Sequence, residues 1–442
     1  MKIQLSDSFT YKKLLKFTFP SIIMMIFTSI YGVVDGIFVS NFAGKIPFAS
    51  INLIMPVFMI IGAIGFMMGT GGSALVARYL GEGQNEKANR TFSMLIYVSL
   101  AFSLVVSVLG FIFIEPLARL LGAEGEMLRC CVIYGQILLP TMFAFILQNE
   151  FQAFMIVAAK PTMGLFVTVA AGVTNIVLDA LFVGIFKCGL QGAAVATAMS
   201  QLIGGTVPLL YFTFSKKAPL KLCKTSVNFK DLVKACTNGS SEMMTNISMS
   251  LVTILYNFQL LKFAGENGVA AYGTIMYVNF IFISIFIGFC IGSAPVISFH
   301  FGAQNHSELK KLLKMSLIII GAFSVGMTII SLFLARPLSH IFVGYDKELF
   351  EITAKGFIIY CFSFLLAGFN IFGSSFFTAL NDGLVSAVIS FLRTLLFQVL
   401  AVMILPIFLK LDGIWLSIIV AEFLSLIVVF IFIKKMQPKY KY

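Results

Sequence analysis

The sequence is poor in charge. Asp, Glu, Lys and Arg make up 11% of its 442 residues, whereas roughly a quarter of the residues in a soluble protein are charged. It also has only 1 Trp and 3 His, while apolar residues reach 59% and the mean hydropathy is +0.99. So few polar side chains cannot cover a water-facing surface, which excludes an ordinary soluble protein and indicates an all-α polytopic membrane protein.

Several motifs are also missing. No strands of alternating polarity are present, which excludes a membrane β-barrel. The seven Cys have no CxxC spacing, so we interpret them as small apolar residues and expect no disulfide or metal site. The three His form no HExxH pair, and no segment resembles a channel filter, which argues against a membrane enzyme or a channel. We therefore expect no catalytic activity and no cofactor. The N-terminal segment has no small-residue cleavage site, so we expect the first helix to stay uncleaved.

Apolar runs bounded by Gly, Pro, Asn and charges predict twelve membrane-spanning helices, each long enough to cross the bilayer. Because twelve is even, both termini are expected on one side. The predicted spans are 14–40, 49–78, 92–115, 130–155, 162–185, 190–214, 237–262, 270–298, 313–335, 352–377, 384–409 and 414–434.

The basic residues predict the orientation. The net charge is +12, and the termini and the connections on their side hold 21 of the 31 Lys and Arg. The other side holds 9. Because basic residues accumulate in cytoplasmic loops, we expect both termini in the cytoplasm and the protein in the cell (plasma) membrane. The positive charge is explained by topology, so we expect the lipid bilayer and no nucleic acid as a partner.

The second half of the chain repeats the first. Gly72-Ser73-Ala74 and Gln84-Asn85 recur 220 residues later, while Phe42-Ala43-Gly44 and Gly192 recur 221 residues later. Each half would hold six spans, so the copies enter the membrane in one orientation and are related by a pseudo-two-fold axis along the membrane normal. The sequence predicts an N-terminal six-helix lobe (1–215), a basic cytoplasmic linker (216–234) and a C-terminal six-helix lobe (235–442).

Acids inside spans are the candidates for function, because burying a carboxylate in a membrane costs several kcal/mol. Asp35 lies midway along the first span, with Tyr31 one helical turn before it. In the fifth span Asn175 and Asp179 have the same spacing. Two buried Asp would share one proton, because burial and mutual repulsion disfavour two charges. The pattern predicts a proton or Na⁺ site, and only in the first half, because Tyr256 takes the place of Asp35 in the second.

Four other charged residues within spans have two interpretations each. Glu150 and Glu422 fit either functional acids or buried groups held by hydrogen bonds. Arg393 fits either a counterion in a central cleft or a structural cation. Glu242, early in the seventh span, would lie across the cleft and serve either the substrate or a second ion.

Some motifs are more specific. These are Pro20 and Asp35 in the first span, Tyr134 in the fourth, Asn175-Ile-Val-Leu-Asp179 in the fifth, and Gly192-Ala-Ala-Val-Ala-Thr197 with Ser200-Gln201 in the sixth. With them, the chain resembles the multidrug and toxic compound extrusion (MATE) transporters over its whole length. It looks most like the prokaryotic DNA-damage-inducible type and, in general texture, the staphylococcal-type multidrug exporters.

The resemblance implies a set of site residues. The cation-coupling site would consist of Asp35, Asn175, Asp179 and Thr197. Supporting residues of the cavity would be Tyr31, Tyr134, Gln201 and Glu242, and Pro20 would let the first helix bend. Glu242 is similar to an acid that another branch of the family uses for Na⁺, although spans ten and eleven here lack that branch's second acid.

The implied function is a secondary active antiporter. It would export amphipathic, mainly cationic small molecules in exchange for H⁺ or Na⁺ by alternating access, working as a monomer with no cofactor beyond the coupling ion. The alternative is a flippase of the same superfamily for lipid-linked oligosaccharides or lipid II. A flippase would need a large hydrated cavity with several cations, and Arg393 is the one cation that lies well inside a predicted span and not within a few residues of its end.

Overall fold

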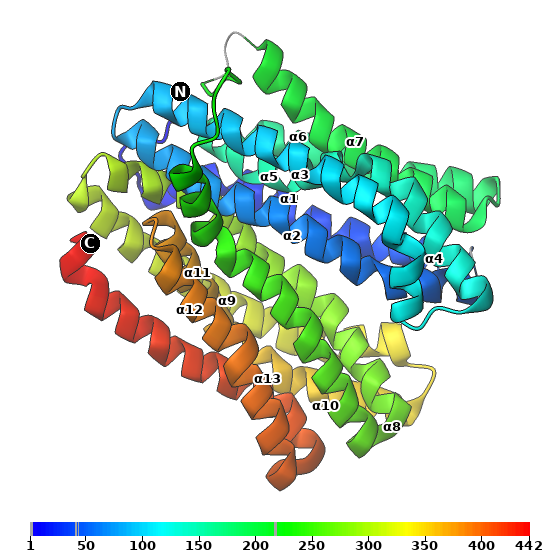
Figure 1. Ribbon diagram of the computed structural model, residues 1–442. Coiled ribbons are helices and arrows are strands. Elements are labelled where there is room, and N and C mark those ends of the chain that lie inside the picture. Colours follow the sequence, from blue (N-terminus) through cyan, green and yellow to red (C-terminus); the bar gives the residue numbers. More distant parts are fainter. Residues whose placement is uncertain (1–2, 40–41, 43, 216–218) are drawn as a thin grey trace.

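The computed structural model describes residues 3–39, 42, 44–215 and 219–442. These residues are almost entirely helical and contain no strand (Figure 1). The first half holds α1 (Tyr11–Phe38), α2 (Lys45–Gly81), α3 (Asn85–Leu120), α4 (Gly125–Leu138), η2 (Leu139–Thr141), α5 (Met142–Val157), α6 (Pro161–Asp179), η3 (Ala180–Ile185) and α7 (Gly189–Phe214). The second half holds α8 (Phe229–Gly302), α9 (His306–Val343), α10 (Lys347–Cys361), α11 (Phe364–Ala379), α12 (Gly383–Phe391), η4 (Leu392–Leu396) and α13 (Phe397–Tyr440).

Breaks and bends in the longest helices account for the twelve predicted spans. The continuous helix α8 turns back at Gly265 (φ 61°, ψ −151°), and α13 does so at Lys410 (φ 50°, ψ −128°). Conversely, α10 and α11 form one span bent by 51°, and η2 joins α4 to α5. Within the described ranges, the helices therefore form twelve spans, as the apolar runs predicted.

Left-handed backbone recurs at matching places in the two halves. Three pairs of positive-φ residues are each separated by 221 positions: Gly44 and Gly265, Gly83 and Gln304, Gly189 and Lys410. Each pair occupies a tight connection between spans, where glycine is the least strained residue. The duplication therefore extends to the backbone, and the helices of the two halves form two bundles (Figure 1).

The seventh span begins earlier than predicted. The sequence placed its start at residue 237 and assigned 216–234 to a linker, but α8 begins at Phe229. The Asn228 side chain accepts hydrogen bonds from the backbone N–H groups of Lys230 and Asp231, and such a cap supports helix initiation. The first turn contains polar and basic residues, so the apolar run used for the prediction did not include the start of this helix. Residues 216–218 lie outside the described part of the chain.

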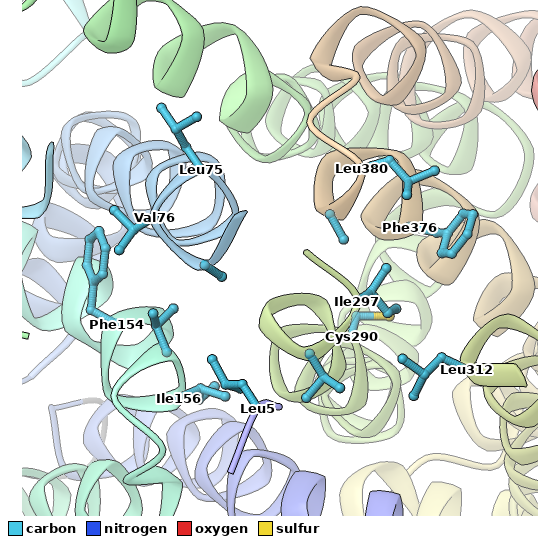
Figure 2. Close-up of a cluster of buried hydrophobic side chains, with 14 of the residues drawn as sticks. Leu5, Leu75, Val76, Phe154, Ile156, Cys290, Ile297, Leu312, Phe376 and Leu380 are labelled. Atoms are coloured by element: carbon cyan, nitrogen blue, oxygen red, sulfur yellow. The ribbon is translucent and has the colours of Figure 1, made fainter. Parts of the chain in front are cut away.

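The buried apolar side chains form three clusters. One contains residues from both halves, among them Leu75 and Phe154 of the first and Ile297 and Phe376 of the second (Figure 2). Another lies wholly within residues 39–198, and a third within residues 252–418. In Figure 1 the two bundles lie closest at the end that carries both termini and diverge toward the other end. One shared core therefore joins the halves at the end near the termini, which we call the closed end.

Glycines let the two bundles approach at the closed end. The Cα of Gly71 on α2 packs against the α8 backbone at Ala235 and Gly239, and that of Gly302 packs against the backbone at Arg78. A β-carbon at either glycine would overlap a backbone carbonyl. Close backbone approach through small residues is the usual way to pack helices in membranes, because lipid supplies no hydrophobic force between them.

Polar contacts strengthen this junction. The Tyr79 hydroxyl of α2 donates to Asp231 Oδ1 on α8 at 2.7 Å. The segment before α1 crosses to the second half, where the Phe9 N–H donates to Glu308 Oε1 at 2.6 Å and the Ser8 hydroxyl donates to Glu308 Oε2 at 3.1 Å. The Phe9 ring is fully buried. The N-terminal segment is therefore a strap that ties the first half to α9.

The glycine packing at the closed end can be tested by adding one methyl group. Gly71→Ala should separate α2 from α8 and destabilise the protein by about 1–3 kcal/mol, the usual cost of overpacking. Thermal unfolding of the purified protein in detergent would measure this. Gly326→Ala in α9 is the matched control, because open space surrounds that position, so its melting temperature should stay level or rise slightly. Equal melting temperatures for the two variants would contradict this packing model.

Candidate functional site

The predicted residues of the first half converge from three helices. Asp35 comes from α1, Asn175 and Asp179 from α6, and Thr197 from α7. The carboxyl group of Asp35 lies within hydrogen-bonding reach of the Asp179 and Asn175 side chains. Asp179 is fully buried and Asn175 is 2% exposed. The structure therefore brings Asp35, Asn175 and Asp179 together.

Several oxygens of the cluster have no hydrogen-bond partner. Both oxygens of Asp179, together with Asp35 Oδ1, Asn175 Oδ1 and Thr197 Oγ1, are buried and have no hydrogen-bond partner among the described residues. Two ionised carboxylates cannot donate to each other. Each buried polar group without a partner costs about 1–3 kcal/mol. The arrangement thus favours a proton shared by the two acids or a cation held by these oxygens.

Other polar residues surround the two acids. Gln148 of α5 lies within reach of the Tyr31 hydroxyl, and Tyr134 of α4 is buried near Thr197 and both acids. Gln201 is anchored by the Thr141 hydroxyl, which donates to its Oε1 at 3.1 Å. Tyr31 and Tyr134 therefore lie close to the acids, whereas the sequence did not indicate Gln148 and Thr141.

Local backbone features position the acids. Gly172 of α6 packs against the rings of Phe27 and Tyr31, where a β-carbon would collide with them. This glycine lets α6 approach α1 closely enough for their acids to meet. Directly after Asp179 the helix widens into the π-helical turn η3, a feature often found at functional sites.

Glu242 lies apart from this cluster, as predicted. It lines a cavity of 490 Å³ that is bordered mainly by the second half, with Met25, Ser29, Thr70, Ser73 and Ala153 contributed by the first. Its side chain makes no hydrogen bond or ion pair with the described residues, since Asn246 bonds only its backbone carbonyl. Glu242 is thus an unpaired acid facing a cavity between the halves.

Arg393 and Glu422 form an ion pair at the wall of the same cavity. The guanidinium donates through Nε and Nη2 to both oxygens of Glu422 at 2.8–3.0 Å. Asn370 adds a bond of 2.6 Å to Glu422 Oε2. This pairing supports the structural interpretation of Glu422. Both residues line the same cavity as Glu242. The sequence did not indicate that Arg393 and Glu422 pair, although they lie in successive predicted spans.

Glu150 lies buried between helices. Its side chain on α5 is fully buried, and neither carboxyl oxygen has a hydrogen-bond partner among the described residues. Both interpretations of Glu150 stay predictions. Tight packing of its backbone against Gly69 of α2 fixes it between two helices.

Pro20 is accommodated without interrupting its helix. α1 continues from Tyr11 to Phe38 through this residue. Proline lacks the N–H that would bond the preceding turn, so the helix has one backbone bond fewer at this point. The predicted bending at Pro20 stays a prediction.

Comparisons with known proteins agree with this architecture. The MatE family model matches residues 20–181 and again 243–403, so the two matches fall on the two halves. The multidrug export protein MepA of Staphylococcus aureus is 25% identical over 390 residues, covering 87% of this chain and 84% of that protein. The protein of the same name from Staphylococcus saprophyticus is 24% identical over 375 residues, covering 82% and 81%.

Solved structures share the fold. An outward-facing multidrug resistance MATE family transporter superposes with a TM-score of 0.93 at 23% identity, covering 98% of this chain and 97% of that one. A MATE structure in the bent conformation gives a TM-score of 0.90 at 23% identity, with 99% and 97% covered. Because the family model matches well over half of the sequence, in both halves, this chain belongs to the MatE family.

Proposed function

We propose that the protein is a multidrug efflux antiporter that exports amphipathic, mainly cationic compounds in exchange for H⁺ or Na⁺. The observation that carries this proposal is the pair of buried acids, Asp35 and Asp179, that face each other inside one half of a two-bundle molecule, with both oxygens of Asp179 and Oδ1 of Asp35 unpartnered among the described residues. Family membership and the similarity to MepA multidrug export proteins support the same reading.

The position of the closed end favours an outward-facing state of the transport cycle. Both termini lie at that end, and the distribution of basic residues favours a cytoplasmic position for it. The cavity beside Glu242 would then open toward the outside, and the protein would be a multi-pass protein of the plasma membrane in an outward-facing state. Alternating access requires that the contacts of Gly71 and Gly302 separate while the opposite ends close.

The coupling ion would bind at the oxygen cluster. H⁺ or Na⁺ entering from outside would neutralise Asp35 and Asp179, and oxygen atoms are the ligands that hard cations prefer. Neutralisation removes the electrostatic attraction for a cationic substrate and permits its release. One charge that moves inward supplies about 2.3 kcal/mol per 100 mV, which corresponds to roughly fiftyfold accumulation. Bending of α1 at Pro20 would accompany this step.

A flippase is less well supported. Among the described residues that line the cavity beside Glu242, Arg393 is the one Lys or Arg, and Glu422 already neutralises it. A lipid pyrophosphate needs several cationic partners.

Ion-driven transport can be tested in proteoliposomes loaded with a fluorescent lipophilic cation. A pH gradient or a Na⁺ gradient, imposed separately, should drive export by the native protein. Asp35→Asn and Asp179→Asn should each lower the initial rate at least about tenfold, because an amide cannot alternate between charged and neutral forms. Glu115→Gln is the control, since Glu115 is an exposed acid paired with Arg119. Export unaffected by both Asn variants, or driven by neither gradient, would refute the proposal.

The shared ion also predicts a change in stability. A ligand that binds only the folded state raises stability, so the native protein should melt at a higher temperature in acid or in added Na⁺, according to the coupling ion. Asp179→Asn supplies the missing donor to Asp35, so this variant should lose most of that dependence. Melting curves at two pH values, with Na⁺ or choline, would measure it. An unchanged dependence in the variant would place the ion elsewhere.

A further inference from the structure

The segment that joins the two halves, residues 219–228, is held along α3. The backbone N–H of Lys221 donates to Asn89 Oδ1 at 2.9 Å, and that of Cys223 donates to the Ser93 hydroxyl at 2.9 Å. The last residue of the segment, which caps α8, donates its N–H to a methionine sulfur of α3. The joining segment, α3 and the start of α8 therefore lie side by side at the closed end (Figure 1).

A cavity of 740 Å³ lies between these three elements. Its walls carry Lys87 and Arg90 from α3 and Lys224 from the joining segment. The two acids in the walls already have partners, since Glu86 accepts from Arg90 Nη2 at 2.6 Å and Asp231 accepts from a tyrosine hydroxyl of α2. Lys87 and Lys224 form no ion pair within the described ranges. The cavity therefore has more basic than acidic side chains, and two of its cations lack a counterion.

The cations of this cavity are positioned by their neighbours. The Lys87 ammonium lies 4.0 Å from the centroid of the Tyr79 ring, and the Tyr79 hydroxyl is fixed by its bond to Asp231. Lys234, partly buried on α8, adds a further positive charge near Lys87. Arg90 retains Nε and Nη1, because its bond to the neighbouring acid uses Nη2 alone. A guanidinium and an ammonium on separate walls are well suited to bind a phosphate group between them.

An exposed apolar strip continues from the cavity along α3. Arg90, Tyr97 and Leu104 follow one another at seven-residue spacing, so they lie on one face of the helix. Tyr97 and Leu104 are 42% and 66% exposed, and Val227 and Phe229 beside the cavity are 64% and 74% exposed. On a membrane-spanning helix such an apolar face contacts lipid tails, and tyrosine is typical of the boundary between tails and head groups. The cavity therefore lies at the level of the lipid head groups.

We propose that this cavity binds the head group of an anionic phospholipid. The lipid would come from the leaflet at the closed end, which the basic residues indicate is the cytoplasmic one. Its phosphate would lie between Arg90 and Lys224, near Lys87, and its acyl chains would follow the exposed strip of α3. Basic pockets between membrane helices on the cytoplasmic side are typical head-group sites. The site is separate from the cavity beside Glu242, because the two share no lining residue among those described.

Matched ligands test this assignment. The purified full-length protein in neutral detergent would be titrated with dioctanoyl phosphatidylglycerol, dioctanoyl phosphatidylcholine or glycerol 3-phosphate, and native mass spectrometry would measure the bound fraction. Phosphatidylglycerol should bind at least about tenfold more tightly than phosphatidylcholine, which has the same chains but no net charge, and than glycerol 3-phosphate, which has no chains. Arg90→Gln/Lys224→Gln removes one exposed cation from each wall and should weaken phosphatidylglycerol binding at least about tenfold.

Lys310→Gln/Lys314→Gln is the matched control, because it removes two exposed lysines from α9 at the same end of the molecule, and it should change the affinity less than about twofold. Arg90→Lys/Lys224→Arg keeps both charges and should stay within about threefold of the native affinity. Equal losses in the control and the Gln variant, or equal affinities for the two phospholipids, would overturn the assignment. Glycerol 3-phosphate that binds as tightly as phosphatidylglycerol would also overturn it, because the ligand would then be a soluble phosphate. The measurement uses no ion gradient, so its result is independent of ion-driven export.

Discussion

The close contact between α2 and α8 is the constraint on which the rest of the molecule depends. Glycines at Gly71 and Gly302 bring the two backbones together, and the apolar cluster of both halves forms around them. Toward the other end each bundle has its own core. A molecule joined at one end in this way can hold a cavity between its halves and can close it by rocking, without unfolding either core.

Burying two carboxylates in a membrane protein costs free energy, which other interactions must offset. Both oxygens of Asp179 and Oδ1 of Asp35 lack a donor among the described residues, so a shared proton or a bound cation would stabilise the pair. The close contact of Gly172 with the Tyr31 ring brings α6 against α1 at this place. The same property that destabilises the unliganded state would therefore supply the coupling.

The two halves have diverged in their charges while keeping one backbone plan. The first half holds an acid pair that lacks a counterion among the described residues. The second half instead has the Arg393–Glu422 pair and the free carboxylate of Glu242. The two halves therefore differ in the sign of the charges that they bury, although they share one backbone plan.

The sequence by itself determined the membrane class, the twelve spans and the duplication, and it marked Asp35 and Asp179 as acids inside spans. These features follow from composition and from helical spacing, which are local properties. The group that adds Asn175 and Thr197 to the two acids came from the resemblance to the MATE transporters. The early start of α8 at its Asn228 cap was missed because polar residues hide it. Only the tertiary structure decided that Arg393 pairs with Glu422 beside Glu242, and that Glu150 has no donor. Contacts between distant spans depend on how whole helices pack, and no local pattern records that packing.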